Sequence, residues 1–265
     1  MKLLESQNKF KIFVVGTGGT GSQLIPFLMQ LLNNHIEDEH KITLIDGDII
    51  ESKNLKNQKF SYFDVSQPKS KVLCERYQTI YKDINISYID NYILNKETLI
   101  NLINDTPYKY TPILISCVDN NASRRLFNEV FYDKSIKNII YIDSGNGTKN
   151  RNGQVVVGYK ATINHIQYEI LKPVCKIFKN ILKDDDSLKS LTSCVQIVDK
   201  YPQNIATNVM AATTIFTIMN EIISFNEINT HIAYFDAQNT SILNRNVKDV
   251  DYKNFIKEKN IICVA

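Results

Sequence analysis

The sequence lacks an uninterrupted apolar run long enough for an export signal or a membrane span. The short apolar run near the N-terminus stops at the glycine-rich segment 16–21, and polar residues interrupt the most apolar stretch, 205–225. We therefore expect 205–225 to form a buried or interface helix. The missing export signal predicts a cytoplasmic protein that does not engage a membrane.

Paired cysteines and clustered histidines are also missing. The five cysteines form no C-x-x-C pair, and the four histidines show neither H-E-x-x-H nor another ligand spacing. A reducing compartment keeps such cysteines as free thiols. We therefore expect no structural zinc. The cysteines are Cys74, Cys117, Cys175, Cys194 and Cys263.

The chain has little excess of one charge, because 31 Lys and Arg residues nearly balance 28 Asp and Glu residues and the net charge is only +3. A nucleic-acid footprint needs lysine and arginine clustered on one face, so we expect no nucleic-acid partner. Hydrophobic residues make up 43% and charged residues 22% of the chain, which is ordinary globular usage and excludes a disordered or collagen-like protein.

The first half of the chain alternates short β-branched runs with helical stretches. This alternation predicts an α/β fold, a Rossmann-like doubly wound parallel sheet with helices on both faces. The expected strands are 11–15, 41–45, 85–89, 112–118 and 138–143, and the expected helices are 22–33, 69–81, 96–104 and 122–132.

The second half has a different pattern. Segments 153–159, 232–236 and 242–246 are typical of strands, and we expect them to extend the sheet in antiparallel fashion. The polar stretch 172–192 predicts a surface excursion with some helix. We interpret 1–265 as one domain, with a nucleotide-binding half, 9–147, and a C-terminal half, 148–265.

A glycine-rich turn follows the first expected strand and precedes the first expected helix. Gly16, Gly18, Gly19 and Gly21 fit G-x-G-x-x-G, which lets phosphate oxygens approach backbone N–H groups at a helix N-terminus. Asp46 closes the second strand, where an acid accepts hydrogen bonds from ribose hydroxyls. These residues predict a nucleotide site, and an NAD-dependent oxidoreductase would account for them equally well.

Further motifs separate the two classes. They follow in the order D-G-D at 46–48, N-L-K-N-Q at 54–58, Q-P-K at 67–69, C-V-D-N at 117–120, an arginine at 124, D-S-G-N at 143–146 and T-S-C at 192–194. This set, over about residues 9–246, resembles the ThiF/MoeB/HesA family of ubiquitin-activating-type adenylyltransferases. It is most similar to the ThiF-like group of the plasmid-borne PRTRC cassette.

The resemblance implies an ATP- and Mg²⁺-dependent adenylyltransferase acting on the C-terminal carboxylate of a small ubiquitin-like or sulfur-carrier protein. It places Lys69 on the phosphates and Asp119 on Mg²⁺, with Asp48 supporting the ion or the loop and Asn54 bonding phosphate or the loop. The alternatives from the residues themselves are a solvated lysine, a helix cap at Asp119 and a turn at Asn54.

One position departs from the family pattern. Asn57 stands where the family has an arginine, and an amide supplies neither its charge nor its bidentate fork. Lys56 and Lys59 flank this position and are candidates to replace the arginine. The departure leaves a second hypothesis open, a nucleotide-binding scaffold with weak or no adenylation activity. The family's N-terminal arginine motif is absent from residues 1–10.

Two further expectations come from the resemblance. Cys194 matches a family cysteine that in some relatives links covalently to the carrier protein, and a thiolate near cations or a helix N-terminus is reactive. Many relatives do not use this cysteine, so a buried, inert thiol is the alternative. Family members commonly form homodimers through later helices, which makes 205–225 the candidate interface.

Overall fold

The computed structural model describes residues 1–4, 9–147, 151–184 and 204–247. Its elements are β1 (Phe10–Val15), α1 (Gly19–Asn34), η1 (Ile36–Asp38), β2 (Lys41–Ile45), η2 (Ser52–Lys56), η3 (Tyr62–Asp64), α2 (Lys69–Ile80), β3 (Asn85–Ile89), α3 (Lys96–Asn104), β4 (Thr111–Ser116), α4 (Asn121–Tyr132), β5 (Ile139–Asn146), β6 (Asn152–Ile163), β7 (Ile166–Leu171), α5 (Val174–Ile177), η4 (Lys179–Lys183), α7 (Ile205–Phe225), β8 (Thr230–Asp236) and β9 (Ser241–Asn246).

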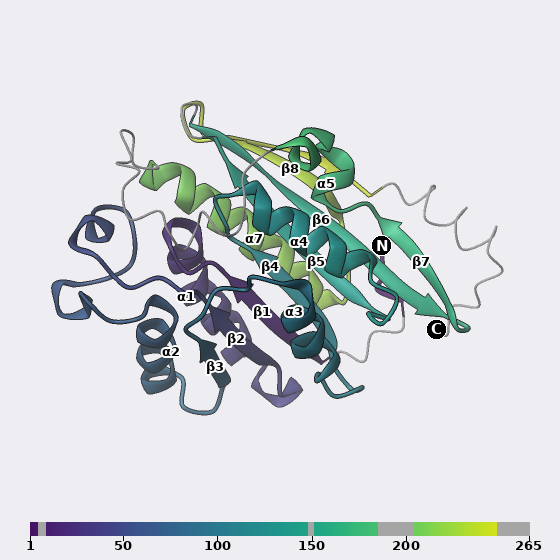
Figure 1. The fold of residues 1–265 in the computed structure, drawn as a ribbon, viewed down its shortest axis with the longest axis horizontal. Coiled ribbons are helices and arrows are strands. Elements are labelled where there is room, and N and C mark those ends of the chain that lie inside the picture. The colour runs from purple at the N-terminus through teal and green to yellow at the C-terminus, as the bar shows by residue number, and fades with distance from the viewer. Residues whose placement is uncertain (5–8, 148–150, 185–203, 248–265) are drawn as a thin grey trace.

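A nine-stranded sheet runs through both halves of the chain (Figure 1). Its order is β3-β2-β1-β4-β5-β6-β8-β9, and β7 pairs with β6. The strands from β3 to β5 are parallel, and β6 to β9 pair antiparallel. The central register aligns Val15 with Ile45 on one side and with Ser116 on the other, so the carboxyl ends of β1, β2 and β4 lie side by side.

Helices cover both faces of the sheet. Successive side chains of each strand point to opposite faces, so every central strand contributes to two cores. Ile12 and Val14 of β1 pack into a core with α1, α2 and α7, whereas Phe13 and Val15 pack into a second core with α3, α4 and α5. This layering confirms the predicted doubly wound α/β fold with antiparallel strands added in the C-terminal half.

Helix α7 packs beside α1 and against the sheet. Ala211, Ala212, Ile215 and Met219 on α7 are fully buried. By length and composition α7 could cross a membrane, and it is the one such helix among the described residues. Half of its apolar window is buried within the protein. Its buried side chains pack against α1 and the sheet, as in the core helices of many globular proteins.

The C-terminal half differs in detail from the sequence prediction. Strand β6 is longer than the predicted 153–159, and β7 was not predicted at all. Within the expected excursion 172–192, the described part forms the short helices α5 and η4, and residues 185–192 lie outside the described residues.

Candidate nucleotide site

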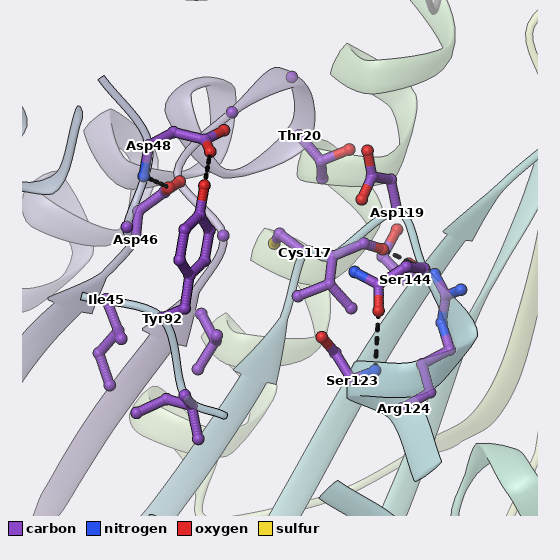
Figure 2. A pocket seen from close by; sticks show the side chains of 18 of the residues that line it. Thr20, Ile45, Asp46, Asp48, Tyr92, Cys117, Asp119, Ser123, Arg124 and Ser144 are labelled. Carbon is purple, nitrogen blue, oxygen red and sulfur yellow. Dashed lines mark hydrogen bonds between the residues drawn. The ribbon is translucent and has the colours of Figure 1, made fainter. Parts of the chain in front are cut away.

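A cavity of about 670 Å³ lies at the carboxyl ends of β1, β2, β4 and β5 (Figure 2). The glycine turn, the loop after β2, the start of α2 and the loop after β4 all contribute to its wall. In parallel α/β sheets, ligands bind at this end of the strands, next to a change in strand order. In this sheet the strand order reverses at β1: β2 and β3 follow on one side of β1, and β4 and β5 follow on the other.

The glycine turn is shaped by two glycines that no other residue could replace without a clash. Gly16 has φ +88°, and a Cβ on Gly16 would lie 2.8 Å from the Cys117 carbonyl oxygen. A Cβ on Gly21 would lie 2.0 Å from the Gly16 oxygen. At Gly18 a Cβ would meet nothing closer than the Gln58 amide, at 3.6 Å. Gly16 and Gly21 thus set the turn, while Gly18 leaves space beside the cavity.

The N-terminus of α1 opens onto this space. Helix α1 begins at Gly19, and its N-cap residue is Gly18, which has no side chain to accept from the first-turn N–H groups. Gly18, Gly19 and Thr20 all line the cavity. Backbone N–H groups and the positive end of the helix dipole at such a position attract anions, so this wall suits phosphate.

Asp46 holds the glycine turn in place. Its Oδ2 accepts from the Thr17 backbone N–H at 2.6 Å and from the Thr17 hydroxyl at 2.9 Å, and its Oδ1 accepts from the Asp48 N–H at 2.9 Å. Burial raises the pKa of Asp46. Asp46 lines the cavity, and its contacts also give it the turn-stabilising role that was the alternative interpretation of an acid at this strand end.

Lys69 is the first residue of α2 and is 5% exposed. Its Nζ lies 2.6 Å from Asp48 Oδ2, and its backbone N–H donates to the Asp48 carbonyl. Tyr92 donates its hydroxyl to the other Asp48 oxygen (Figure 2). Burial raises the pKa of Asp48, but Lys69 and Tyr92 outweigh it, so the net pKa is lowered. An ionised Asp48 therefore orients the ammonium at the cavity wall.

Asp119 lies beyond β4 and lines the same cavity. Figure 2 shows its carboxyl near Thr20, across the cavity from Asp48. The helix-cap alternative for Asp119 is wrong, because Asn120 is the N-cap of α4 and its Oδ1 accepts from the Ser123 N–H at 2.8 Å. The lysine and the aspartate predicted to act together therefore contribute to one cavity.

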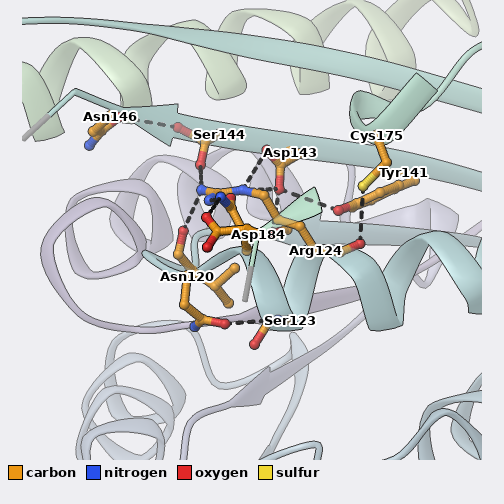
Figure 3. A network of polar contacts seen from close by, with 12 residues as sticks. Asn120, Ser123, Arg124, Tyr141, Asp143, Ser144, Asn146, Cys175 and Asp184 are labelled. Atoms are coloured by element: carbon orange, nitrogen blue, oxygen red, sulfur yellow. Dashed lines mark hydrogen bonds and ion pairs between the residues drawn. The ribbon is translucent and has the colours of Figure 1, made fainter. Parts of the chain in front are cut away.

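A buried ion pair supports the floor of the site (Figure 3). Arg124 Nε lies 3.1 Å from Asp143 Oδ2, and the guanidinium also donates to the carbonyl oxygens of Val118 and Ser144. The Ser116 hydroxyl donates to Asp143 at 2.7 Å. Burial lowers the pKa of Arg124, but Asp143, Tyr141 and Asp119 together outweigh it, so the net pKa is raised. The pair ties together the ends of β4 and β5. The sequence motifs included Arg124 but did not indicate this structural role.

The loop after β2 departs from the predicted picture in one respect. Asn54 is not among the residues that line the cavity; its Oδ1 accepts from the Glu51 N–H at 2.9 Å in a capping box around η2. Asn57 and Gln58 do line the cavity, whereas Lys56 and Lys59 do not. Asn54 therefore makes the turn-stabilising contact. Neither of the lysines that flank Asn57, Lys56 and Lys59, lines the cavity wall.

None of the cysteines in the described part of the chain has the environment of a reactive thiolate. Burial raises the pKa of Cys74 to about 11 and that of Cys175 to about 12, and it also raises the pKa of Cys117. Cys117, at the end of the predicted strand 112–118, lies just past β4, where it packs against the core and also lines the cavity. Cys194 lies outside the described residues.

Three polar features of the site were missed by sequence reasoning. Tyr92 comes from the loop after β3, and Gln58 Oε1 is buried without a hydrogen-bond partner among the described residues. Asn146 donates to Thr20 Oγ1 at 3.0 Å and to Asn208 Oδ1 at 2.8 Å, which joins β5, α1 and α7. Gln58 and Asn146 lie in the motifs at 54–58 and 143–146, but the motifs do not specify what these side chains face, and no motif marks Tyr92.

The cavity carries more negative than available positive charge. Asp46, Asp48 and Asp119 line it, and so do the cations Lys69 and Arg124, of which Arg124 is paired with Asp143. Within the described residues no group of three or more His, Cys, Asp or Glu side chains could hold a metal ion. The described residues therefore offer a cation separate carboxylates along the cavity wall, and no closed metal cage.

A glycine turn at a helix N-terminus, with a lysine and an aspartate on the same cavity at the carboxyl edge of a parallel sheet, defines an α/β protein with a candidate nucleotide site. The ThiF family model matches residues 2–254, and the chain belongs to the ThiF family. No curated protein sequence matches the chain.

Solved structures with the same fold include E. coli MccB with succinimide, at TM-score 0.59 and 18% identity over 91% of this chain and 64% of that one. PaaA is similar at TM-score 0.60 and 14% identity, over 91% and 65%. E. coli MccB with ATP gives TM-score 0.58 and 20% identity, over 89% and 63%. The chain thus spans less than two thirds of the length of these proteins.

Proposed function

We propose that the protein is an ATP-dependent adenylyltransferase that activates the C-terminal carboxylate of a small ubiquitin-like or sulfur-carrier protein. The observation that carries this proposal is the presence of Lys69, Asp119 and the glycine turn on one cavity. Membership of the ThiF family and the likeness to an MccB structure that contains ATP support ATP as the nucleotide.

In the proposed reaction a carboxylate oxygen attacks the α-phosphorus of ATP. An acyl-adenylate forms, the bond from the α-phosphorus to the bridging oxygen breaks, and pyrophosphate leaves. Such a step needs neutralisation of phosphate charge more than proton transfer. The α1 N–H groups and the Lys69 ammonium would supply it, while Asp48 and Tyr92 keep Lys69 oriented.

Mg²⁺ fits the donor set of this cavity. Three carboxylates, one lysine and an arginine already paired with Asp143 line it, so a bare triphosphate would add to an excess of negative charge. Mg²⁺ is usually held by one or two carboxylates together with substrate phosphates rather than by a protein cage. Asp119 is the carboxylate we propose as its ligand. When bound, Mg²⁺ would neutralise charge on the phosphates.

The proposed acyl substrate is a carrier or peptide with a free C-terminal carboxylate. One MccB structure contains MccA, and the similarity of this sequence to the PRTRC group of ThiF-like proteins supports a small protein partner.

We also propose a cytoplasmic homodimer that uses α7. Ile205 and Phe225, at the two ends of this helix, are 49% and 60% exposed.

ATP–pyrophosphate exchange tests the proposed reaction. The carriers to test are β-grasp proteins that end in Gly-Gly and whose genes adjoin the gene for this protein. We expect radiolabel to move from pyrophosphate into ATP only when both Mg²⁺ and the carrier with an intact C-terminus are present. A carrier that lacks its terminal glycine serves as the control. No exchange above that control would contradict the proposed activity.

The second hypothesis is a nucleotide-binding scaffold without adenylation chemistry. Asn57, which lines the cavity in place of a family arginine, is the observation that favours it. A scaffold would bind ATP in a calorimetric titration but give no exchange with its carrier. A third hypothesis, an NAD-dependent oxidoreductase, predicts the opposite nucleotide preference in the same titration.

A further inference from the structure

A polar network joins the cavity to α7. Asn146 Nδ2 donates to Thr20 Oγ1 at 3.0 Å and to Asn208 Oδ1 at 2.8 Å. Thr20 and Asn146 line the cavity, whereas Asn208 does not. Asn208 is fully buried in the first turn of α7, the helix that packs beside α1. The network therefore connects a residue of the cavity wall with a helix of the C-terminal half.

The network leaves the hydroxyl proton of Thr20 without a close acceptor. Thr20 Oγ1 accepts one Asn146 proton, and the one acceptor for its own proton among the described residues is Asn208 Oδ1, at 3.5 Å. A hydroxyl donor normally lies about 2.7–2.8 Å from the oxygen that accepts its proton. Asn208 is therefore too distant to hold this proton, which is available to an acceptor in the cavity.

Packing alone does not account for Asn208. Its Oδ1 accepts from Asn146, but its Nδ2 is buried without a hydrogen-bond partner among the described residues. An unsatisfied buried donor lowers stability, and an apolar side chain at this position would avoid that cost. The amide oxygen is what Asn208 contributes, because it holds Asn146 and, through Asn146, the Thr20 oxygen.

Thr20 lies where phosphate is expected. It is the second residue of α1, so its backbone N–H has no partner within the helix. Figure 2 shows its hydroxyl on the side of the cavity where Asp119 lies. Asp119 is the proposed ligand of Mg²⁺, which proteins hold together with substrate phosphates. The phosphates would therefore lie near both donors of Thr20.

We propose that the Thr20 hydroxyl donates a hydrogen bond to a phosphate oxygen of the bound nucleotide, and that Asn146 and Asn208 are positioning residues that hold its oxygen. The C-terminal half of the chain thereby contributes to the nucleotide site through α7. This inference rests on ATP as the nucleotide of the proposed function, and it does not depend on the adenylation step.

Calorimetric titration of the full chain tests the phosphate contact. Thr20→Val replaces the hydroxyl with a methyl group of similar size. It should weaken ATP binding in Mg²⁺ about tenfold, as expected for a lost hydrogen bond to a charged acceptor. Binding of adenosine, which has no phosphate, should change less than about twofold, measured by displacement. Thr20→Ser keeps the hydroxyl and should retain most of the ATP affinity.

Thr207→Val is the matched control for the loss of a buried hydroxyl. Thr207 is buried in the first turn of α7, does not line the cavity, and its Oγ1 has no hydrogen-bond partner among the described residues. Thr207→Val should bind ATP with the affinity of the wild type. Thermal unfolding of each variant shows whether it is folded.

A double-mutant cycle tests the positioning role of Asn208. Asn208→Leu alone should weaken ATP binding about fivefold, because Asn146 loses the acceptor that orients it. In the Thr20→Val background it should cause less than about a twofold further loss, since the hydroxyl through which it acts is gone. A merely structural role would give the same loss in both backgrounds. Thr20→Val by itself still tests the phosphate contact should Asn208→Leu fail to fold.

Several results would overturn the proposal. Equal losses of ATP and adenosine affinity in Thr20→Val, or a Thr207→Val variant that loses as much ATP affinity, exclude the phosphate contact. Additive losses in the cycle exclude the positioning role. The exchange assay is separate, because ATP affinity that depends on Thr20 without any exchange retains this inference and rejects the adenylation.

A wild-type protein that does not bind ATP would reject the proposed nucleotide, and inorganic tripolyphosphate in Mg²⁺ then becomes the probe. Tripolyphosphate binding that Thr20→Val weakens about tenfold would support the phosphate contact. A wild-type protein that binds neither ATP nor tripolyphosphate would overturn it.

Discussion

The two ends of the parallel strands contain the same kinds of charged residues but arrange them differently. At the carboxyl end, Asp46, Asp48, Lys69 and Asp119 line a cavity of about 670 Å³. At the amino end, a smaller cavity of about 370 Å³ lies beside α1 and β2. There Lys9 and Lys109 both contact Glu39, at 2.7 Å and 3.6 Å.

The difference comes from backbone geometry. At the amino end, each strand follows a loop, and charged side chains near the surface pair with one another, which contributes little to stability. At the carboxyl end, β1 leads directly into the N-terminus of α1, and the side chains that follow β2 and β4 meet its N–H groups around an open space. Charge at the carboxyl end therefore predicts ligand binding, whereas charge at the amino end forms surface pairs with little effect on stability.

The largest effect is expected where the glycine turn is tightest. Gly21→Ala places a methyl group 2.0 Å from the Gly16 oxygen and should lower the free energy of unfolding by about 3 kcal/mol or more. Gly18→Ala meets only the Gln58 amide and should change stability by less than about 0.5 kcal/mol, while it weakens nucleotide binding. Urea denaturation measures the free energy of unfolding of both variants, and ATP titration measures their nucleotide affinity. Equal destabilisation by both variants would contradict the assigned roles.

Lys69→Met should weaken binding of ATP with Mg²⁺ about 100-fold, because it removes the one lysine that lines the cavity in the described residues. Lys71→Met is the matched control on the same helix. Lys71 is 39% exposed in its side chain and contacts Glu75 at 3.8 Å. Its loss should change affinity less than about twofold. Similar losses in the two variants would place the phosphates elsewhere.

Asp119→Asn should lower nucleotide affinity in Mg²⁺ about 30-fold and should leave the weak affinity in EDTA unchanged or slightly higher, since one negative charge is removed. Asp133→Asn, at the other end of α4, is the control. Asp133 accepts from Ser135 and does not line the cavity. Calorimetry at matched ionic strength makes the comparison, and an Asp119→Asn variant that keeps its full Mg²⁺ dependence would exclude Asp119 as the ligand.

At the amino end, His40 should affect stability and not nucleotide binding. Burial lowers the pKa of His40 to about 4, and its Nδ1 accepts from the Phe10 N–H at 3.1 Å. The unfolded state binds a proton below about 6.5 that the folded state does not, so stability is full above that pH and falls as the pH decreases toward 4.

The expected loss between pH 7 and pH 5 is on the order of 2 kcal/mol. His40→Asn keeps an acceptor for Phe10 but does not titrate, so its stability should change less over this range in chemical denaturation. A variant with the wild-type slope would show that another group is responsible. ATP affinity of the variant at pH 7 should equal that of the wild type.

The smallest effect is a gain. Asn57 lines the cavity without a charge, so Asn57→Arg should strengthen ATP binding about fivefold by adding a guanidinium next to the phosphates. Lys56→Arg, which lies outside the cavity lining, should leave affinity unchanged. Parallel titrations in low and high salt check the electrostatic origin, because the gain should shrink as salt rises.

Local patterns were sufficient to predict most of the parallel half. The strands 41–45 and 85–89 and the helix 96–104 have the bounds that the sequence predicted. Strand β7 was missed although Ile166, Tyr168 and Ile170 alternate with polar residues, and α5 is only four residues long. The partner of β7 is the strand immediately before it, so β7 was detectable from local sequence, whereas a four-residue helix such as α5 carries little periodic signal.

The site was predictable in its motifs and not in its contacts. The glycine turn, Asp46, Lys69 and Asp119 could be placed on one edge because parallel strands end there together. Which of Asp119 and Asn120 caps α4, and whether Asn54 faces the cavity or η2, depends on side-chain geometry that spacing does not specify. The pairing of Asp48 with Tyr92 required the fold itself.

Calorimetric titration of the full chain with ATP in the presence of Mg²⁺, beside the same titration with NAD⁺, tests the central claim most directly. The account predicts saturable 1:1 binding of ATP that depends on Mg²⁺ and is weakened about 100-fold in Lys69→Met, with no measurable binding of NAD⁺. Tighter binding of NAD⁺ than of ATP, or ATP binding that Lys69→Met leaves intact, would contradict it.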